Sequence, residues 1–244
     1  MHLALIGYGR MGHEVELVAK EKGMKIAKTF EIGENRHGSA LTKSALKGVD
    51  VCIDFSSPES AFENITAVAE AGVNIVVGTT GWHDRLEEVR ALVKKKGIGC
   101  LYASNFSLGV NIFLQIVMDA SHLLDAYSDY DVAVSEVHHR GKSDSPSGTA
   151  LSLGSTILKE LRRKNEILSE TSHGVIKPNQ LHVSSMRLGN TTGKHSVIFD
   201  SEADTIELVH TAKNRRGFAL GAIVAAEWLK GKKGMYTMRD VLHP

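Results

Sequence analysis

Short apolar runs and helix-spaced apolar residues alternate along the first part of the chain, up to Ala103. Five runs have the length and apolar character of strands in a parallel sheet, and they cover Leu3–Ile6, Lys25–Phe30, Val51–Phe55, Val73–Val77 and Ile98–Ala103. Between them, apolar residues recur at helical spacing in Met11–Val18 and Leu86–Val93. Another helix is expected to start at Ser57-Pro58, since serine favours the N-cap and proline the first helical position. The alternation predicts an α/β fold with a Rossmann-type, doubly wound parallel sheet.

Beyond Ala103 the pattern changes. Helices are predicted at Gly109–Leu124 and Thr149–Arg162, and strands at Asp131–Val137, Leu181–Leu188, Lys194–Ser201 and Thr205–Ala212. The last two strands alternate polar and apolar residues, which predicts a mostly antiparallel sheet with one wetter face. The helix Phe218–Leu229 is apolar on nearly all sides, so we expect it to return to the first domain. The predicted organisation is a dinucleotide-binding domain of residues 1–108 completed by 217–244, and an α+β domain of residues 109–216. No role is predicted for the polar residues 163–179.

The bulk composition disfavours several classes of protein. Of the 244 residues, 42% are hydrophobic and 23% are charged, and the net charge of +1 gives no pull toward nucleic acid. No uncharged apolar run approaches the ~20 residues that span a bilayer, and no signal peptide is evident. Cys52 and Cys100 lie in apolar strand-like runs and are expected to be buried thiols in a reducing compartment. We expect a soluble cytoplasmic enzyme without nucleic-acid or membrane partners.

Gly7, Gly9 and Gly12 follow the first strand and open the first helix, which is the context in which G-x-G-x-x-G binds a dinucleotide. Gly7 permits the tight turn, Gly9 lets the backbone approach the pyrophosphate, and Gly12 lets helix and strand pack closely. The backbone N–H groups at the helix start would meet the phosphates. The alternative is that these glycines only shape a turn.

Glu31 follows the second strand, about 20 residues after the glycine turn. A carboxylate there can accept hydrogen bonds from the adenine ribose and repel a 2′-phosphate, which favours NADH. Lys28, Arg36 and His37 lie nearby in sequence and could accommodate NADPH, so both cofactors stay open. A solvated loop acid is the alternative for Glu31.

Two loops after later strands are further candidates for the cofactor site. Gly78-Thr79-Thr80-Gly81 ends the fourth strand, and Ser104-Asn105-Phe106-Ser107 follows the fifth. Ligands of open α/β sheets bind outside the carboxyl ends of the strands, so both loops are candidates for contacts to the nicotinamide end of a dinucleotide. A plain turn is the alternative for each.

The segment from Glu136 to Ala150 leaves a strand, forms a polar loop and enters a helix. His138, His139 and Lys142 supply positive charge and proton donors, and a histidine can act as a general acid near neutral pH. The helix start, Pro146 to Thr149, offers backbone N–H groups and two hydroxyls, which suit a carboxylate. Together these features predict a dicarboxylate pocket, with a basic loop before a well-capped helix as the alternative. No metal is expected, because His138 and His139 point in opposite directions and no ligand set completes them.

Several motifs occur together in this chain. They are Gly7-Tyr8-Gly9-Arg10-Met11-Gly12, Asp54-Phe55-Ser56, Gly78-Thr79-Thr80-Gly81, Asn105-Phe106-Ser107-x-Gly109-Val110-Asn111, E-x-H-H-x-x-K-x-D-x-P-S-G-T-A from Glu136 to Ala150, Arg187-x-Gly189, Gly193-x-His195 and Arg215-x-x-Phe218-Ala219-x-Gly221-Ala222. With them the chain resembles the 4-hydroxy-tetrahydrodipicolinate reductase (dihydrodipicolinate reductase) family over nearly its whole length. The long segment is similar to that family's signature.

The resemblance implies roles for individual residues. His138 matches the general acid, and Lys142 matches the lysine that assists protonation and holds negative charge. Substrate-carboxylate contacts are implied for His139, Ser147, Gly148 and Thr149. Cofactor contacts are implied for Gly7, Arg10, Met11, Glu31, Gly78, Thr80 and Ser104–Phe106, with Arg215 and Phe218 bordering the cofactor as the domains close. Some relatives carry a basic residue after the acid that assists NADPH; here it is Ile32, which further favours NADH.

The implied reaction reduces a cyclic dicarboxylate, 4-hydroxy-tetrahydrodipicolinate or dihydrodipicolinate, to tetrahydrodipicolinate in diaminopimelate and lysine biosynthesis. The resemblance also implies a homotetramer built through the sheet of the second domain. One alternative is another two-domain NAD(P)-dependent dehydrogenase; a phosphorylating semialdehyde dehydrogenase would need an accessible cysteine, and sugar oxidoreductases usually carry a Glu-Lys-Pro triplet that this chain lacks. The other is a non-enzymatic dinucleotide sensor, which would have no use for His138, His139 and Lys142.

Overall fold

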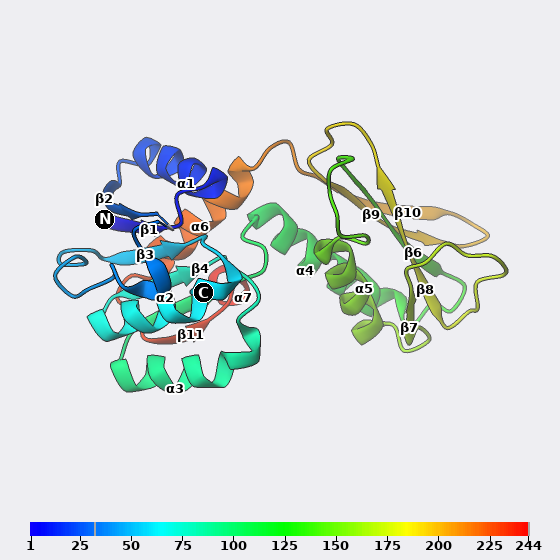
Figure 1. The fold of residues 1–244 in the computed structure, drawn as a ribbon. Helices are drawn as coiled ribbons and strands as arrows, with labels where there is room; N and C mark the ends of the chain where they lie inside the picture. Colours follow the sequence, from blue (N-terminus) through cyan, green and yellow to red (C-terminus); the bar gives the residue numbers. More distant parts are fainter. Residues whose placement is uncertain (32, 244) are drawn as a thin grey trace. The chain divides into compact units, whose positions relative to one another are not determined.

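The computed structural model describes residues 1–31 and 33–243, which form two compact units (Figure 1). The first unit comprises Met1–Leu108 and the chain from Arg215 onward, and the second comprises Gly109–Asn214. Ile32, which bears on the choice of cofactor, lies outside the described residues. Each unit has its own sheet and its own apolar core.

A six-stranded parallel sheet forms the centre of the first unit, in the order β11-β5-β4-β3-β1-β2. Its strands are β1 (His2–Ile6), β2 (Lys25–Phe30), β3 (Val51–Asp54), β4 (Asn74–Val77), β5 (Gly99–Tyr102) and β11 (Gly234–Tyr236). The predicted Rossmann-type sheet is confirmed, and β11 is the strand that the sequence pattern did not predict. The strand order reverses between β1 and β3, the position at which ligands bind in such sheets.

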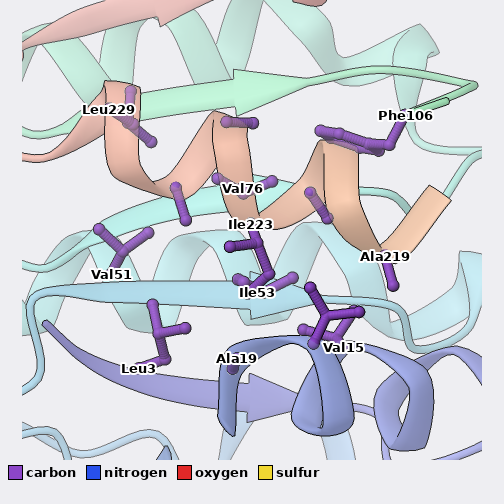
Figure 2. Packing of buried hydrophobic residues seen from close by; sticks show 14 of the residues in the cluster. Leu3, Val15, Ala19, Val51, Ile53, Val76, Phe106, Ala219, Ile223 and Leu229 are labelled. Atoms are coloured by element: carbon purple, nitrogen blue, oxygen red, sulfur yellow. The ribbon is translucent and has the colours of Figure 1, made fainter. Parts of the chain in front are cut away.

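Helices cover both faces of this sheet because successive strand residues point to opposite sides. The helices are α1 (Arg10–Glu21), α2 (Pro58–Ala71), α3 (Leu86–Lys96), α6 (Arg216–Leu229) and α7 (Met238–Leu242), with short 3-10 turns η1 (Arg36–Gly38) and η2 (His83–Arg85). Leu3 and Leu5 of β1 join the core with α1 and α6, whereas Ala4 and Ile6 join the core with α2 and α3. Figure 2 shows the first of these cores, in which Ile223 of α6 lies in one cluster with apolar residues of α1 and the sheet.

The second unit contains a five-stranded sheet in the order β10-β9-β6-β8-β7. Its elements are α4 (Leu108–Leu124), β6 (Asp131–His138), α5 (Gly148–Glu160), β7 (Glu166–Leu168), β8 (Gln180–Arg187), β9 (Lys194–Asp200) and β10 (Thr205–Thr211). β6, β9 and β10 pair antiparallel, whereas β8 pairs parallel with both β6 and β7. The predicted α+β architecture is confirmed, with a sheet that is mixed in its strand directions.

Residues 163–179, for which no role was predicted, contain the short strand β7. The Lys164 side chain is 2% exposed and forms an ion pair with Asp131 at 2.5 Å. Its ammonium also donates to the carbonyl of Gln180 at 2.8 Å. A buried cation with two oxygen partners fixes this segment against the ends of β6 and β8. Of the helices described, none has the length and apolar composition to cross a membrane.

Candidate active site

The turn after β1 leaves no room for a side chain at two of its glycines. Gly7 has φ +83°, and a Cβ placed on it would lie 2.3 Å from the carbonyl oxygen of Phe55. A Cβ on Gly12 would lie 2.5 Å from the carbonyl oxygen of Gly7. No side chain fits at either position, so Gly7 shapes the turn and Gly12 allows the first turn of α1 to pack against it, as the motif predicts.

Gly9 differs from these two glycines because a Cβ placed on it would meet no atom within 4 Å. Gly9 is the N-cap residue of α1, and no side-chain hydrogen bond caps that helix start. Arg10 is exposed, Met11 is half-buried, and no ion pair of Arg10 occurs within residues 1–31 and 33–243. An open helix N-terminus beside a cation is suited to a pyrophosphate, since backbone N–H groups and the helix dipole favour negative charge there.

Glu31 lies next to this turn. The N–H of Gly7 donates to the carbonyl of Phe30 at 2.9 Å, which fixes the end of β2 against the end of β1. Glu31 is the next residue, and its side chain is exposed. A free carboxylate at the end of β2 is the arrangement that the ribose prediction requires.

The Gly78–Thr80 loop after β4 is held by a buried carboxylate. Asp54, at the end of β3, is fully buried and accepts from the Thr79 hydroxyl at 2.6 Å and from the Ser56 hydroxyl at 2.7 Å. Burial raises the pKa of the Asp54 carboxyl, and the hydrogen bonds oppose that rise. The Thr79 hydroxyl is therefore used within the protein, while Thr80 is exposed at the strand end. A Cβ on Gly78 would collide with the ring of Phe55 at 2.0 Å.

The loop after β5 combines an exposed start with a buried end. Ser104 is exposed and Asn105 is half-buried, with its side-chain oxygen accepting from the N–H of Ser107 at 2.9 Å. Phe106 is 2% exposed and belongs to the core formed with α1 and α6 (Figure 2). The cofactor role predicted for Phe106 therefore does not rest on its ring.

Arg215 and Phe218 lie at the start of α6, in the same unit as the other predicted cofactor residues. Arg215 is exposed and Phe218 is half-buried. The first unit thus contains every residue predicted for the cofactor.

In the second unit, β6 places His138 and Glu136 on the same face of the sheet, because they are two residues apart. The Glu136 carboxylate is fully buried, and its Oε2 is hydrogen-bonded to Nδ1 of His138. Its Oε1 accepts from Arg187 at 2.9 Å and from the N–H of Ser147 at 3.2 Å. Burial opposes ionisation, but the hydrogen bonds from His138 and Arg187 outweigh it and lower the pKa of the Glu136 carboxyl. Glu136 is therefore an anion that the sequence pattern did not single out.

Ser147 is the N-cap residue of α5, and its hydroxyl accepts from the N–H of Ala150 at 3.2 Å. The same hydroxyl is 3.1 Å from Nε2 of His195, whose ring centroid is 5.1 Å from that of His138. Burial, followed by the neighbouring His138, lowers the pKa of His195 to about 4, so this imidazole is neutral at pH 7. Nδ1 of His195 has no hydrogen-bond partner within the described part of the chain.

Lys142 and Asp144 lie in the loop between β6 and α5 and form an ion pair at 2.6 Å. The Lys142 ammonium lowers the pKa of the Asp144 carboxyl, and the backbone N–H of Gly148 contributes as well. The N–H groups of Ser147 and Gly148, expected to be free, thus already face protein carboxylates. The prediction of an open helix start was wrong in this respect. The spacing of residues along the chain did not show which carboxylates would contact the first N–H groups of the helix. His139 is half-exposed, and Thr149 is half-buried in the first turn of α5.

Two alternative chemistries find no support in the described residues. Cys52 and Cys100 are fully buried, and burial raises the pKa of both thiols, so neither is an accessible nucleophile. Within residues 1–31 and 33–243 no group of three or more His, Cys, Asp or Glu side chains is placed to hold a metal ion. The site residues that the sequence did not single out are Glu136, Arg187 and His195, which appeared only as members of longer motifs.

Two family models match this chain, one over its N-terminal part and one over its C-terminal part. The family model described as dihydrodipicolinate reductase, N-terminus, matches residues 1–106, and the one described as dihydrodipicolinate reductase, C-terminus, matches residues 109–242. The chain belongs to the dihydrodipicolinate reductase family. The resemblance inferred from the motifs is thereby confirmed, and dihydrodipicolinate reductases are oxidoreductases that use NAD(P)H.

Two curated relatives illustrate how completely the family covers this chain. The 4-hydroxy-tetrahydrodipicolinate reductase of Christiangramia forsetii is 41% identical over 242 residues, covering 99% of this chain and 98% of the relative. That of Archaeoglobus fulgidus is 38% identical over 260 residues, covering 99% of this chain and 100% of the relative.

Solved structures share the fold. The dipicolinate-bound dihydrodipicolinate reductase from Paenisporosarcina sp. TG-14 has a TM-score of 0.76 at 24% identity and covers 97% of both chains. An amine dehydrogenase from Mycobacterium smegmatis has a TM-score of 0.60 at 13% identity, covering 96% of this chain and 94% of its own. At these identities the likeness concerns the fold alone.

Proposed function

We propose that this chain reduces 4-hydroxy-tetrahydrodipicolinate, or its dehydrated form dihydrodipicolinate, to tetrahydrodipicolinate with NAD(P)H, in the biosynthesis of diaminopimelate and lysine. The observation that carries this proposal is His138, a histidine bonded to a buried carboxylate, in the same segment as Lys142 and a helix start. Family membership over the whole chain supports it.

The first unit supplies the cofactor residues. The side-chain-free N-terminus of α1 at Gly9, with the exposed Arg10, fits a pyrophosphate, and Glu31 fits an adenine ribose. We favour NADH over NADPH because the Glu31 carboxylate would repel a 2′-phosphate. When bound, the reduced nicotinamide supplies the hydride.

The second unit supplies the residues that deliver a proton to the substrate and stabilise its developing negative charge. Nδ1 of His138 is bonded to Glu136. When the imidazole is protonated on both nitrogens, Nε2–H can deliver its proton to the ring atom that gains the electron pair after hydride addition, which leaves a neutral imidazole with its hydrogen on Nδ1. Lys142 stabilises the negative charge that develops on the ring. His139, Ser147, Gly148 and Thr149 hold substrate carboxylates, with the Lys142–Asp144 pair opening as the substrate anion replaces Asp144.

The open face of the second sheet suits the homotetramer. Ala133, Ser135 and Val137 of β6 point away from the helix-covered core, as do Met186, 57% exposed, and Val209, 46% exposed. A sheet face of small and apolar side chains is suited to self-association. A cytoplasmic location is part of the same proposal and follows from the buried free thiols and the biosynthetic role.

A coupled assay tests the function. Dihydrodipicolinate synthase generates the substrate in situ, and oxidation of NADH and of NADPH is followed by absorbance. We expect oxidation only when the synthase is active, and faster with NADH. A chain that binds NADH but does not oxidise it in the presence of active synthase would instead be the dinucleotide sensor. Light scattering on the same preparation tests the tetramer.

A further inference from the structure

We propose that Glu136 is a positioning residue that fixes the His138 imidazole, with Nδ1 as donor to the carboxylate and Nε2 presented to the substrate. This inference rests on the proposed role of His138 as the general acid. It adds a residue to which neither the motif pattern nor family membership gave a function.

The hydrogen bonds around the Glu136 carboxylate set the direction of its bond to His138. Every described partner of Glu136 is a donor: His138 at Oε2, and Arg187 and the N–H of Ser147 at Oε1. The Ser185 hydroxyl also bonds to the carboxyl group. A carboxylate without a proton can only accept, so Nδ1 of His138 must carry the hydrogen in that bond. Glu136, which lies on the same strand as His138, thereby sets the tautomer of the His138 imidazole.

Gly193 lies next to the other ring nitrogen of His138, Nε2. A Cβ on Gly193 would lie 2.9 Å from Nε2 of His138 and 3.2 Å from Cδ2. Any side chain at this position would press on the ring edge that has to deliver the proton. Glu136 therefore holds Nδ1 of the ring, while the absence of a side chain at Gly193 keeps Nε2 free of contact.

Glu136 also connects His138 to the rest of the proposed site. Its Oε1 fixes the N-cap residue Ser147 directly. The Arg187 that it binds also donates to the carbonyl of Asp144 at 2.6 Å, and the Asp144 carboxylate pairs with Lys142. One buried carboxylate thus fixes His138, the start of α5 and the loop that carries Lys142.

The variant Glu136→Gln separates positioning from packing. Two donors face the Oε1 position, so the amide oxygen takes that place and the amide NH₂ faces His138. Nδ1 of His138 must then become an acceptor, and the doubly protonated imidazolium would meet an amide donor. We expect kcat to fall about 100-fold, within the range for a lost general acid. The KM for NADH should change less than about twofold, because the cofactor residues lie in the other unit.

A spectroscopic measurement tests the tautomer without any turnover. In protein labelled with 15N-histidine, the His138 signals are assigned by their loss in His138→Gln. With the imidazole in its neutral form, we expect the proton on Nδ1 in the wild type and on Nε2 in Glu136→Gln. An unchanged tautomer in Glu136→Gln would overturn the proposal, whether or not the wild-type chain reduces the substrate. If the wild type shows the Nδ1 proton but does not reduce the substrate, that result contradicts the proposed function and leaves the role of Glu136 in place.

Two further variants guard against a merely structural effect. Glu136→Asp keeps the charge, and we expect a smaller loss of kcat with the Nδ1 proton retained, even if Glu136→Gln folds poorly. Glu160→Gln breaks a comparable pair at the surface, with His122 at 3.2 Å, and should leave kcat unchanged. The double variant Glu136→Gln, His138→Gln should be no slower than His138→Gln alone. Additive losses, or equal losses in Glu136→Asp and Glu136→Gln, would show that Glu136 only supports the fold.

Discussion

The dinucleotide turn of the first unit depends on glycines, which have no side chain. The histidine site of the second unit depends instead on side chains that are buried and charged. Gly7 and Gly12 leave no room for a Cβ, and Gly9 keeps a helix start open. Glu136, His138 and His195 are each at least nine-tenths buried, and the hydrogen bond between Glu136 and His138 decides which nitrogen of His138 carries a proton. The first site is therefore sensitive to added atoms, and the second to lost charge.

The largest effect is expected in the second site. In His138→Gln the proton donor is lost, and kcat should fall about 10²- to 10⁴-fold. The KM for NADH should stay within about twofold of the wild-type value, because the cofactor residues lie in the other unit. Steady-state kinetics in the coupled assay measures both constants. A kcat within threefold of the wild type would show that another group delivers the proton.

The glycine turn should respond to added atoms. Gly7→Ala places a Cβ 2.3 Å from the Phe55 carbonyl at φ +83°, so the free energy of unfolding should fall by about 2 kcal/mol or more. Gly9→Ala meets no protein atom within 4 Å, so its stability should be nearly unchanged while the KM for NADH rises about tenfold or more. Urea unfolding and NADH titration separate the two. Equal losses of stability in Gly7→Ala and Gly9→Ala would contradict this prediction.

The buried histidine pair predicts a dependence of stability on pH. His195 has its pKa lowered from 6.5 to about 4 in the folded chain, so the unfolded chain binds more protons between these values. Its contribution to stability is present above pH 6.5 and is lost as the pH falls toward 4, by about 2 kcal/mol between pH 7 and pH 5. Urea unfolding across this range measures it. His195→Gln should show a smaller loss than the wild type over the same interval.

The smallest effect concerns cofactor choice. Glu31→Gln removes a charge at an exposed position, and the preference for NADH over NADPH in kcat/KM should fall about tenfold or less. The stability should not change, which distinguishes this variant from changes in the turn. A wild-type preference for NADPH of more than tenfold would reject the ribose role of Glu31.

Much of the fold could be predicted because apolar runs and helical spacing extend over whole elements. The strands β7 and β11 have three residues each, too few for a period to show, and α7 has five. The segment Asp131–Val137 was predicted to be a strand, but that prediction gave no reason to prefer Glu136 over any other polar position. Its burial depends on Arg187 of β8 and on the start of α5, which lie far away in sequence.

The candidate site residues were predicted by motif, whereas the direction of their side chains was not. Thr79 and Phe106 lie in the predicted loops. The hydroxyl of Thr79 nevertheless donates to Asp54, and the ring of Phe106 packs in the apolar core. A motif shows which backbone comes near a ligand. Only the fold decides whether a side chain on that backbone turns toward the ligand or toward the protein.

The alternation along β6 has a consequence for how this chain can evolve. Even-numbered positions carry Glu136 and His138 on the helix-covered face, and odd-numbered positions carry Ala133, Ser135 and Val137 on the open face. Deleting a single residue before Glu136 would exchange the two faces, because side chains repeat every second residue along a strand. Insertions and deletions in β6 should therefore be absent from functional descendants of this chain.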